Sequence, residues 1–305
     1  MIPAKSAVLI ALALGVAMAA AAGTARAGSQ VNKAMKLEPG GRFVLDTFNG
    51  SVNVMGSNES GADVSVTSNW DNIQNQVDFN FEENPGDVEV HVRHRNPFDF
   101  FGFIFSGMRL HFDVRVPKNT RVEIRTSGGS IEVFALAGDA ELRTSGGSIQ
   151  ASQLAGNLRA FTSGGSVRVQ VVHGDANLGT SGGGIEADAV DGALVARTSG
   201  GWVHINGVSG HVDARTSGGS IVAELAKGDS QGGDLFTSGG SIEAKIDPAA
   251  NLEIEASTSG GGVESDLPLR VTGRFAHDYL NGTLGAGGNV LRMHTSGGSI
   301  HIRGL

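Results

Sequence analysis

The stretch TSGGSIEVFALAGDAELR, residues 126–143, is a single repeat that decides the fold of this chain. Its first four residues, Thr-Ser-Gly-Gly, occur nine times. The copies start at Thr126, Thr144, Thr162, Thr180, Thr198, Thr216, Thr237, Thr258 and Thr295. The first six are spaced by 18 residues, and the later gaps are 21, 21 and 37. A fixed period with glycine-rich turns and alternating apolar residues is typical of a stacked β-solenoid.

Each repeat has room for two strands and two turns. Five and seven residues after each Thr the side chains are mostly apolar, with a polar residue between them, which predicts a strand with one buried face. The expected inward ladder at the first of these positions is Ile131, Ile149, Val167, Ile185, Val203 and Ile221. A second strand precedes each Thr, and its inward pairs swap large and small residues between coils, as in Ala140/Leu142 and Leu158/Ala160. We therefore predict an all-β, flattened, two-sheet parallel solenoid with about 18 residues per coil.

The same strand parity points the repeated Thr inward. We expect the Thr hydroxyls of successive coils to bond to one another, and the Ser-Gly-Gly glycines to provide positive φ at the corner. This structural ladder comprises Thr126, Thr144, Thr162, Thr180, Thr198 and Thr216.

The ends of the array are less regular. Residues 28–125 are predicted to form an N-terminal β region and cap with a degenerate first rung at 47–52, and residues 126–305 the solenoid. Residues 279–284 are expected to fill the gap of 37 as a further coil. The final strand, 300–305, is expected to leave an open edge, so self-association through the solenoid ends is possible.

Residues 1–27 resemble a secretory signal peptide. Lys5 precedes an apolar run at 7–22, and Ala25-Arg26-Ala27 matches an A-x-A cleavage site. The alternative, an uncleaved anchor, needs a longer apolar run. We expect an exported chain, periplasmic or extracellular, without a transmembrane segment in its mature form.

The mature chain has 21 basic and 31 acidic residues, a formal charge of −10. This charge disfavours nucleic acid as a partner. The chain contains no cysteine, and therefore neither disulfides nor a thiol nucleophile.

Several chemical sites were weighed against ordinary surface. Gly-Asp corners at Asp139, Asp175 and Asp229 suggest calcium, but each coil offers at most one carboxylate, so turn chemistry is favoured. Arg168, Glu186 and His204 occupy one column and could serve a polysaccharide lyase or hydrolase, although such a column also suits a solvated face. An ice-binding Thr face is disfavoured because the Thr parity is inward. The prediction is no catalytic, metal or cofactor-binding residue and no cofactor.

Residues 96–105 are the most aromatic stretch. They are expected either to plug the solenoid end or to form an interaction patch. That patch consists of Phe98, Phe100, Phe101, Phe103 and Phe105. Outward arginines such as Arg143, Arg197 and Arg215 are expected to matter little for interaction.

Three features together resemble the bacterial putative-adhesin β-strand-repeat family, a domain of unknown function. They are the segment 114–118 (Val-Arg-Val-Pro-Lys), the Thr-Ser-Gly-Gly-Ser-Ile rungs, and the closing Asn281-Gly282 and Gly287-Gly288 before the last rung. The resemblance implies an exported or membrane-tethered protein without established catalytic residues. We expect a non-enzymatic binding, adhesive or envelope-structural module whose partner is an envelope protein or a glycan. The alternative is a polysaccharide-acting enzyme that uses the solenoid face.

Overall fold

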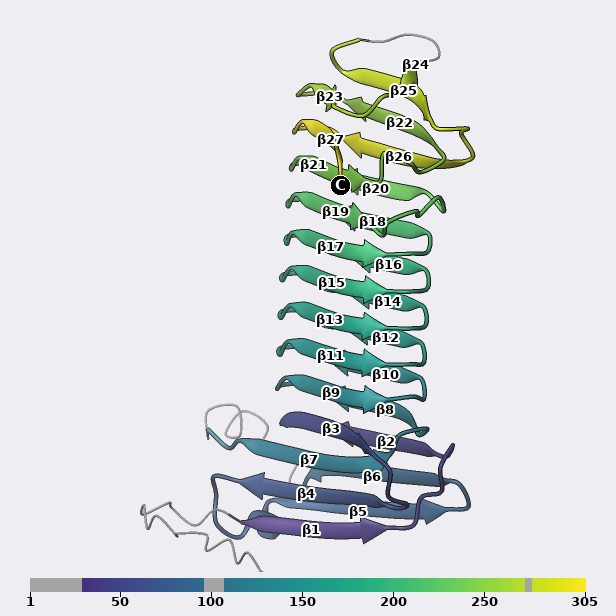
Figure 1. Ribbon diagram of the computed structural model, residues 1–305. Coiled ribbons are helices and arrows are strands. Elements are labelled where there is room, and N and C mark those ends of the chain that lie inside the picture. Colours follow the sequence, from purple (N-terminus) through teal and green to yellow (C-terminus); the bar gives the residue numbers. More distant parts are fainter. Residues whose placement is uncertain (1–28, 96–106, 272–275) are drawn as a thin grey trace, which may run out of the picture.

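The computed structural model describes residues 29–95, 107–271 and 276–305. Two sheets, of 13 and 14 strands, face each other along a straight rod (Figure 1). Inside the described ranges no helix has the length and apolar character needed to cross a membrane. The predicted all-β, two-sheet solenoid is confirmed.

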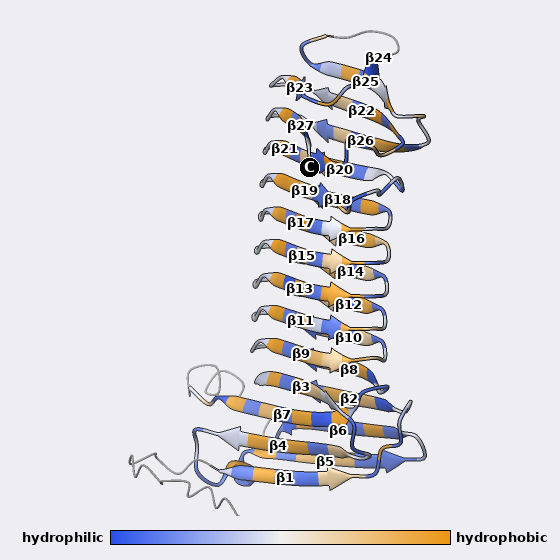
Figure 2. Cartoon of the chain, in the orientation of Figure 1, coloured by the Kyte–Doolittle hydropathy of each residue, from blue (hydrophilic) through white to orange (hydrophobic). Residues whose placement is uncertain are grey.

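The shaft of the rod is built from parallel strands, one per sheet and coil. In the 13-stranded sheet these are β9 (Ile131–Leu136), β11 (Ile149–Leu154), β13 (Val167–Val172), β15 (Ile185–Val190), β17 (Val203–Val208), β19 (Ile221–Leu225) and β21 (Ile242–Ile246). In the 14-stranded sheet they are β8 (Arg121–Thr126), β10 (Ala140–Thr144), β12 (Leu158–Phe161), β14 (Ala176–Gly179), β16 (Leu194–Arg197), β18 (Val212–Thr216) and β20 (Gly233–Thr237). Apolar and polar residues alternate along these strands (Figure 2), so one face of each sheet is buried and the other is free for recognition.

The core between the sheets is dense because neighbouring coils interdigitate. The register places Ala140 beside Leu158 and Leu142 beside Ala160, and all four side chains are buried. The apolar ladder from Ile131 onward is buried in every coil, as predicted. Such complementary packing resists bending and sliding of one coil over the next.

At the amino-terminal end, the first coil does not lie at the end of the rod. Its strands β2 (Arg42–Thr47) and β3 (Ser51–Ser57) lie between the β8/β9 coil and the layer of β6 (Asp87–His94) and β7 (Leu110–Pro117). Beyond that layer, β4 (Ala62–Ser68), β1 (Gln30–Met35) and β5 (Val77–Asn84) add antiparallel strands, and a short 3-10 helix, η1 (Ile73–Asn75), precedes β5. The expected irregular N-terminal β cap and its degenerate first rung are present.

At the carboxyl-terminal end, the last coil is inserted between two earlier ones. Its strands β26 (Asn289–Thr295) and β27 (Ile300–Gly304) lie between the β20/β21 coil and the coil of β22 (Leu252–Thr258) and β23 (Val263–Ser265). The expectation that the final strand leaves an open edge is wrong, because β27 is paired on both sides. The outermost strands here are the short β23 and β24 (Arg270–Val271).

The segment expected to form a further coil also behaves differently. Strand β25 (Tyr279–Leu284) pairs antiparallel with β22, and β24 pairs antiparallel with β25. Residues 279–284 therefore cap the 14-stranded sheet.

The corner glycines serve close stacking. A Cβ added at Gly183 would collide with the carbonyl of Gly165 one coil below, whereas one at Gly182 would lie 3.3 Å from its nearest neighbour, the carbonyl oxygen of Gly164. Of the Thr-Ser-Gly-Gly glycines, all in the described part, only Gly129 has a positive φ. The expected general role of positive φ at this corner is therefore wrong.

Positive φ occurs instead nine residues after the repeated Thr. Ala135, Gln153, Val171 and Ala189 have φ of 52–59°, and Gly207 has 71°. The pairing of β11 with β13 skips two of these residues, because it joins Ser152 to Gln170 and Leu154 to Val172 without Gln153 or Val171. The ladder is interrupted at the same position in both strands, so the coils stay in register.

The repeated Thr is buried, as predicted, but its hydroxyl bonds to glycine and not to the next Thr. Thr180 Oγ1 donates to the carbonyl of Gly165 (2.7 Å) and accepts the N–H of Gly183 (3.3 Å). Gly183 in turn accepts from Thr198 (2.8 Å). The pattern repeats from Thr144 to Thr258, passing through Thr295 of the inserted coil. A continuous hydrogen-bond chain thus runs along this corner of the rod.

Candidate functional site

The predicted aromatic patch, Phe98 to Phe105, lies outside the described residues. Its role as a plug or an interaction patch stays a prediction.

The Gly-Asp corners show turn chemistry. Asp139 accepts the N–H of Asn157 (2.8 Å), Asn157 accepts the N–H of Asp175 (2.9 Å), and Asp175 accepts the N–H of Ala193 (2.9 Å). Each side chain therefore ties its own corner to the next coil. In the parts of the chain that the structure describes, no group of three or more His, Asp or Glu residues could hold a metal ion.

Asp229 occupies a different environment. Its side chain is buried, Oδ1 accepts the N–H of Gln231 (2.9 Å), and Oδ2 has no hydrogen-bond partner in the protein. Burial raises the pKa of this carboxyl group above its usual range. One carboxylate cannot supply the six to eight oxygens that calcium requires.

The column proposed for an enzyme is brought together, but on a flat strand face. Arg168 Nε donates to Glu186 Oε2 (2.6 Å), and Glu186 lies beside His204 in the strand register. The His204 ring packs edge-on against Trp202, with centroids 6.2 Å apart. The Glu186 carboxylate is therefore already engaged by a guanidinium group on an exposed surface. The geometry of this column gives no support to catalysis.

The two faces of the shaft carry opposite charge. The strands of the 14-stranded sheet from β8 to β18 contain six arginines and three acids, a formal charge of +3. The strands of the 13-stranded sheet from β9 to β19 contain one arginine and four acids, a formal charge of −3. A cationic face on an acidic protein is a candidate surface for an anionic ligand.

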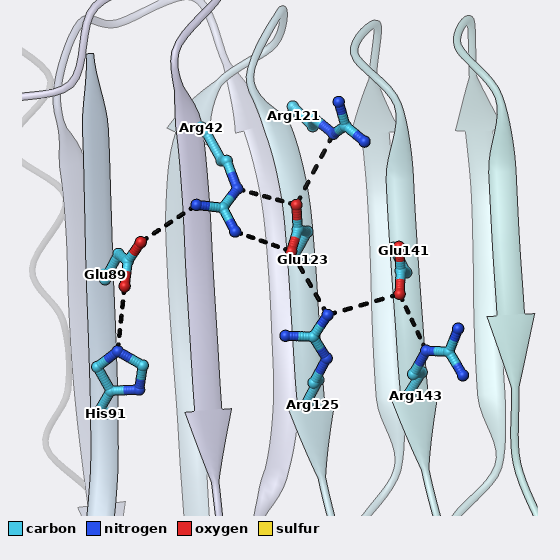
Figure 3. A network of polar contacts seen from close by, with 8 residues as sticks. All are labelled: Arg42, Glu89, His91, Arg121, Glu123, Arg125, Glu141 and Arg143. Carbon is cyan, nitrogen blue, oxygen red and sulfur yellow. Dashed lines mark hydrogen bonds and ion pairs between the residues drawn. The ribbon is translucent and has the colours of Figure 1, made fainter.

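An ion-pair network occupies the amino-terminal part of the cationic face (Figure 3). Arg42 binds both oxygens of Glu123, at 2.9 and 3.0 Å, and also reaches Glu89 at 3.1 Å. The hydrogen bonds from Arg42, with the nearby charges of Arg125 and Arg121, lower the pKa of Glu123 despite its partial burial. This bidentate pair joins β2 to β8 and fixes the first coil against the shaft.

A row of outward side chains runs along the same face, one residue before each repeated Thr. In the order of the coils it reads Arg125, Arg143, Phe161, Gly179, Arg197, Arg215, Phe236, His294 and Ser257. Sequence reasoning treated its arginines as ordinary surface. The repeat alignment contains this row, because the row occupies the position before each repeated Thr. Placing His294 next to Phe236 also requires knowing that the last coil is inserted beside β20.

Comparison with known proteins gives a family and a set of distant structures. The model of the family described as Toastrack DUF4097 matches residues 42–303. No curated protein matches the chain. Solved structures with a similar course include a "putative lipid binding protein" from Parabacteroides distasonis, at 12% identity, a TM-score of 0.48, and coverage of 90% of this chain and 96% of that one.

Others are a "putative adhesin" from the same organism, at 13% identity, a TM-score of 0.44, and 90% and 98% coverage, and one from Bacteroides fragilis, at 13% identity, a TM-score of 0.37, and 92% and 100% coverage. The family match spans most of the chain, including the first coil, the shaft and the inserted last coil. The chain belongs to the Toastrack DUF4097 family.

Proposed function

We propose that this protein is a non-enzymatic, exported rod that binds or organises a component of the cell envelope. The observation that carries the proposal is the rigid array of outward side chains. Continuous ladders in two sheets, a packed core and the Thr–Gly chain hold successive coils at about 4.8 Å. Side chains at equivalent positions are therefore presented in straight rows, which suits recognition of an extended or repetitive partner.

Export is supported by residues 1–27, which have the charge, apolar run and small-residue cleavage site of a secretory signal. The absence of catalysis is supported by the side chains themselves. In the described ranges, the Arg168–Glu186 and His173–Asp191 pairs lie on exposed surface, whereas catalytic pairs need a positioned acid and base around one bond.

The test combines localisation and activity. The full chain is expressed in a bacterial host, fractions are probed for the protein, and its amino terminus is sequenced. The purified mature protein is then incubated with acidic and neutral polysaccharides, and new reducing ends are measured. We expect an exported protein that starts at Gly28 and forms no new chain ends. A cytoplasmic product, or polymer cleavage that is lost in Glu186→Gln, would contradict the proposal.

A further inference from the structure

The row before the repeated Thr contains the same arrangement twice. In the first unit, Arg125 and Arg143 come from adjacent strands, Phe161 follows on the next, and Glu141 lies beside the arginines. In the second unit, the corresponding residues are Arg197, Arg215, Phe236 and Asp213. We call these the first and second guanidinium–aromatic units. Their equivalent residues are four coils apart, about 19 Å at the usual strand spacing.

Each unit holds two guanidinium groups around one shared carboxylate, and in the second unit Asp234 lies beside that carboxylate in the register. Glu141 lies 3.6 Å from Arg125 and 2.9 Å from Arg143, so one carboxylate serves two guanidinium groups. Asp213 is shared in the same way, at 2.5 Å from Arg197 and 2.6 Å from Arg215. The two carboxylate side chains are 23% and 15% exposed, while the four arginine side chains are 46–59% exposed. Guanidinium N–H groups therefore remain available to an anion from solvent.

Each unit also has an aromatic ring that extends over the next coil. A Cβ added at Gly179 would lie 2.7 Å from the Phe161 ring, so the absence of a side chain at Gly179 makes room for this ring. The Arg143 guanidinium lies 5.1 Å from the centroid of the same ring. In the second unit, Phe236 is stacked on His294 with centroids 5.3 Å apart and an interplanar angle of 22°. Rings held in this way offer flat apolar surface beside the charges.

The first unit lines a shallow groove along the Thr-Ser-Gly-Gly corner. Arg125, Arg143 and Phe161 line it together with Asp46, which is paired with Arg93, and with three corner serines, Ser127, Ser145 and Ser163. The serine residues are exposed. In this groove, guanidinium groups, hydroxyl groups and an aromatic ring thus follow one another along the direction of the rod.

We propose that the two units bind one chain of an acidic, carboxylate-bearing polysaccharide that lies along the rod. Guanidinium groups match carboxylates in shape and charge. The rings provide contact for the apolar face of a sugar, and the serines can hydrogen-bond to sugar hydroxyls. A bilayer would need a larger apolar surface than two isolated rings provide. This inference rests on the proposed function and specifies its ligand class.

Two units on one rigid rod predict binding that depends on polymer length. An oligosaccharide too short to reach from one unit to the other occupies a single unit. A longer one occupies both, and the second contact is intramolecular, so the affinity increases by a factor of about 100 or more. The increase should disappear when either unit is removed.

The experiment measures binding of the mature protein to polygalacturonate and to its oligomers of increasing length by biolayer interferometry. The variants are R125A/R143A/F161A and R197A/R215A/F236A. The matched control is R168A/W202A, which removes an arginine and an exposed aromatic residue from the opposite sheet. Thermal melting checks that each variant is folded. If R125A/R143A/F161A does not fold, R125K/R143K replaces it as the variant of the first unit. We expect each unit variant to bind long chains about 100-fold more weakly and the control to bind like the wild type.

Other probes distinguish a failure of this inference from a failure of the proposed function. Equal binding by all folded variants, or an affinity independent of oligomer length, would overturn the inference. Preferential binding to neutral galactan, poly(dT) or anionic phospholipid vesicles would overturn it as well, while binding to an envelope glycan or protein would leave the proposed function standing. Cleavage of polygalacturonate by the wild type would instead refute the proposed function.

Discussion

The hydrogen-bond chain along the Thr-Ser-Gly-Gly corner can be tested with Thr180→Val, which replaces the hydroxyl by a methyl of similar size. Thr180 is 7% exposed, so its contacts are largely shielded from water. The change removes the bond to the Gly165 carbonyl at 2.7 Å and the bond from the Gly183 N–H at 3.3 Å. At roughly 0.5–1.5 kcal/mol for each net bond, the free energy of unfolding should fall by about 1–3 kcal/mol.

The assay is thermal or urea unfolding followed by circular dichroism. At about 2.1 cal/mol/K of unfolding entropy per residue, a loss of this size corresponds to a fall in Tm of about 2–5 °C for the mature chain. The control, Thr180→Ser, keeps the hydroxyl and removes one buried methyl, which costs about 0.8 kcal/mol. The expected order of stability is wild type, then Ser, then Val. If Val is as stable as the wild type, the two hydrogen bonds contribute no net stability and the chain has no energetic role.

Three further variants test the stacking, the positive-φ positions and the ion-pair network. Gly183→Ala should be severely destabilising in a thermal melt because its Cβ meets the coil below, and Gly182→Ala should be tolerated; equal effects would contradict close stacking. Val171→Gly should raise the stability by roughly 0.5–1 kcal/mol in urea unfolding because a half-exposed β-branched residue with φ of 58° is strained. The control, Gln170→Gly, should lower the stability. A loss of stability in both variants would exclude backbone strain at Val171. Glu123→Gln should destabilise by about 1.5–3 kcal/mol at neutral pH. Because the pKa of Glu123 is lowered in the folded state, this contribution is present above the unfolded pKa and lost as the pH falls through the folded pKa. The difference in unfolding free energy between wild type and variant should therefore narrow below about pH 4.5. A difference that widens in acid would contradict the lowered pKa.

The repeat predicted the parts of the fold that depend on local pattern. Period and parity were enough for two sheets, an inward apolar ladder such as Ile185, and the alternating large and small residues of the core. Asp139 and Asp175 were interpreted correctly as corner residues, since each accepts a backbone N–H of the next coil.

The sequence did not reveal features that depend on long-range pairing. The last coil has the same Thr-Ser-Gly-Gly motif as the others, so nothing local shows that β26 pairs with β20 rather than following β22. The column of positive-φ residues includes Ala135 and Val171, residue types that rarely adopt positive φ. The guanidinium–aromatic row becomes apparent only when the coils are placed in their spatial order.

The order of the coils therefore determines which side chains share a face, and it can be measured with engineered disulfides because the chain contains no cysteine. Asp234 and Glu255 each pair with Arg292 in the register, one on either side of β26. D234C/R292C and E255C/R292C place their Cα atoms about 4.8 Å apart, within the range for a disulfide. In D234C/E255C the separation is about 9.6 Å, beyond that range. We predict that mild oxidation cross-links the first two variants and leaves the third reduced, as read by peptide mass spectrometry. Efficient cross-linking of D234C/E255C without D234C/R292C would show that the coils stack in chain order and would contradict the interleaved rod.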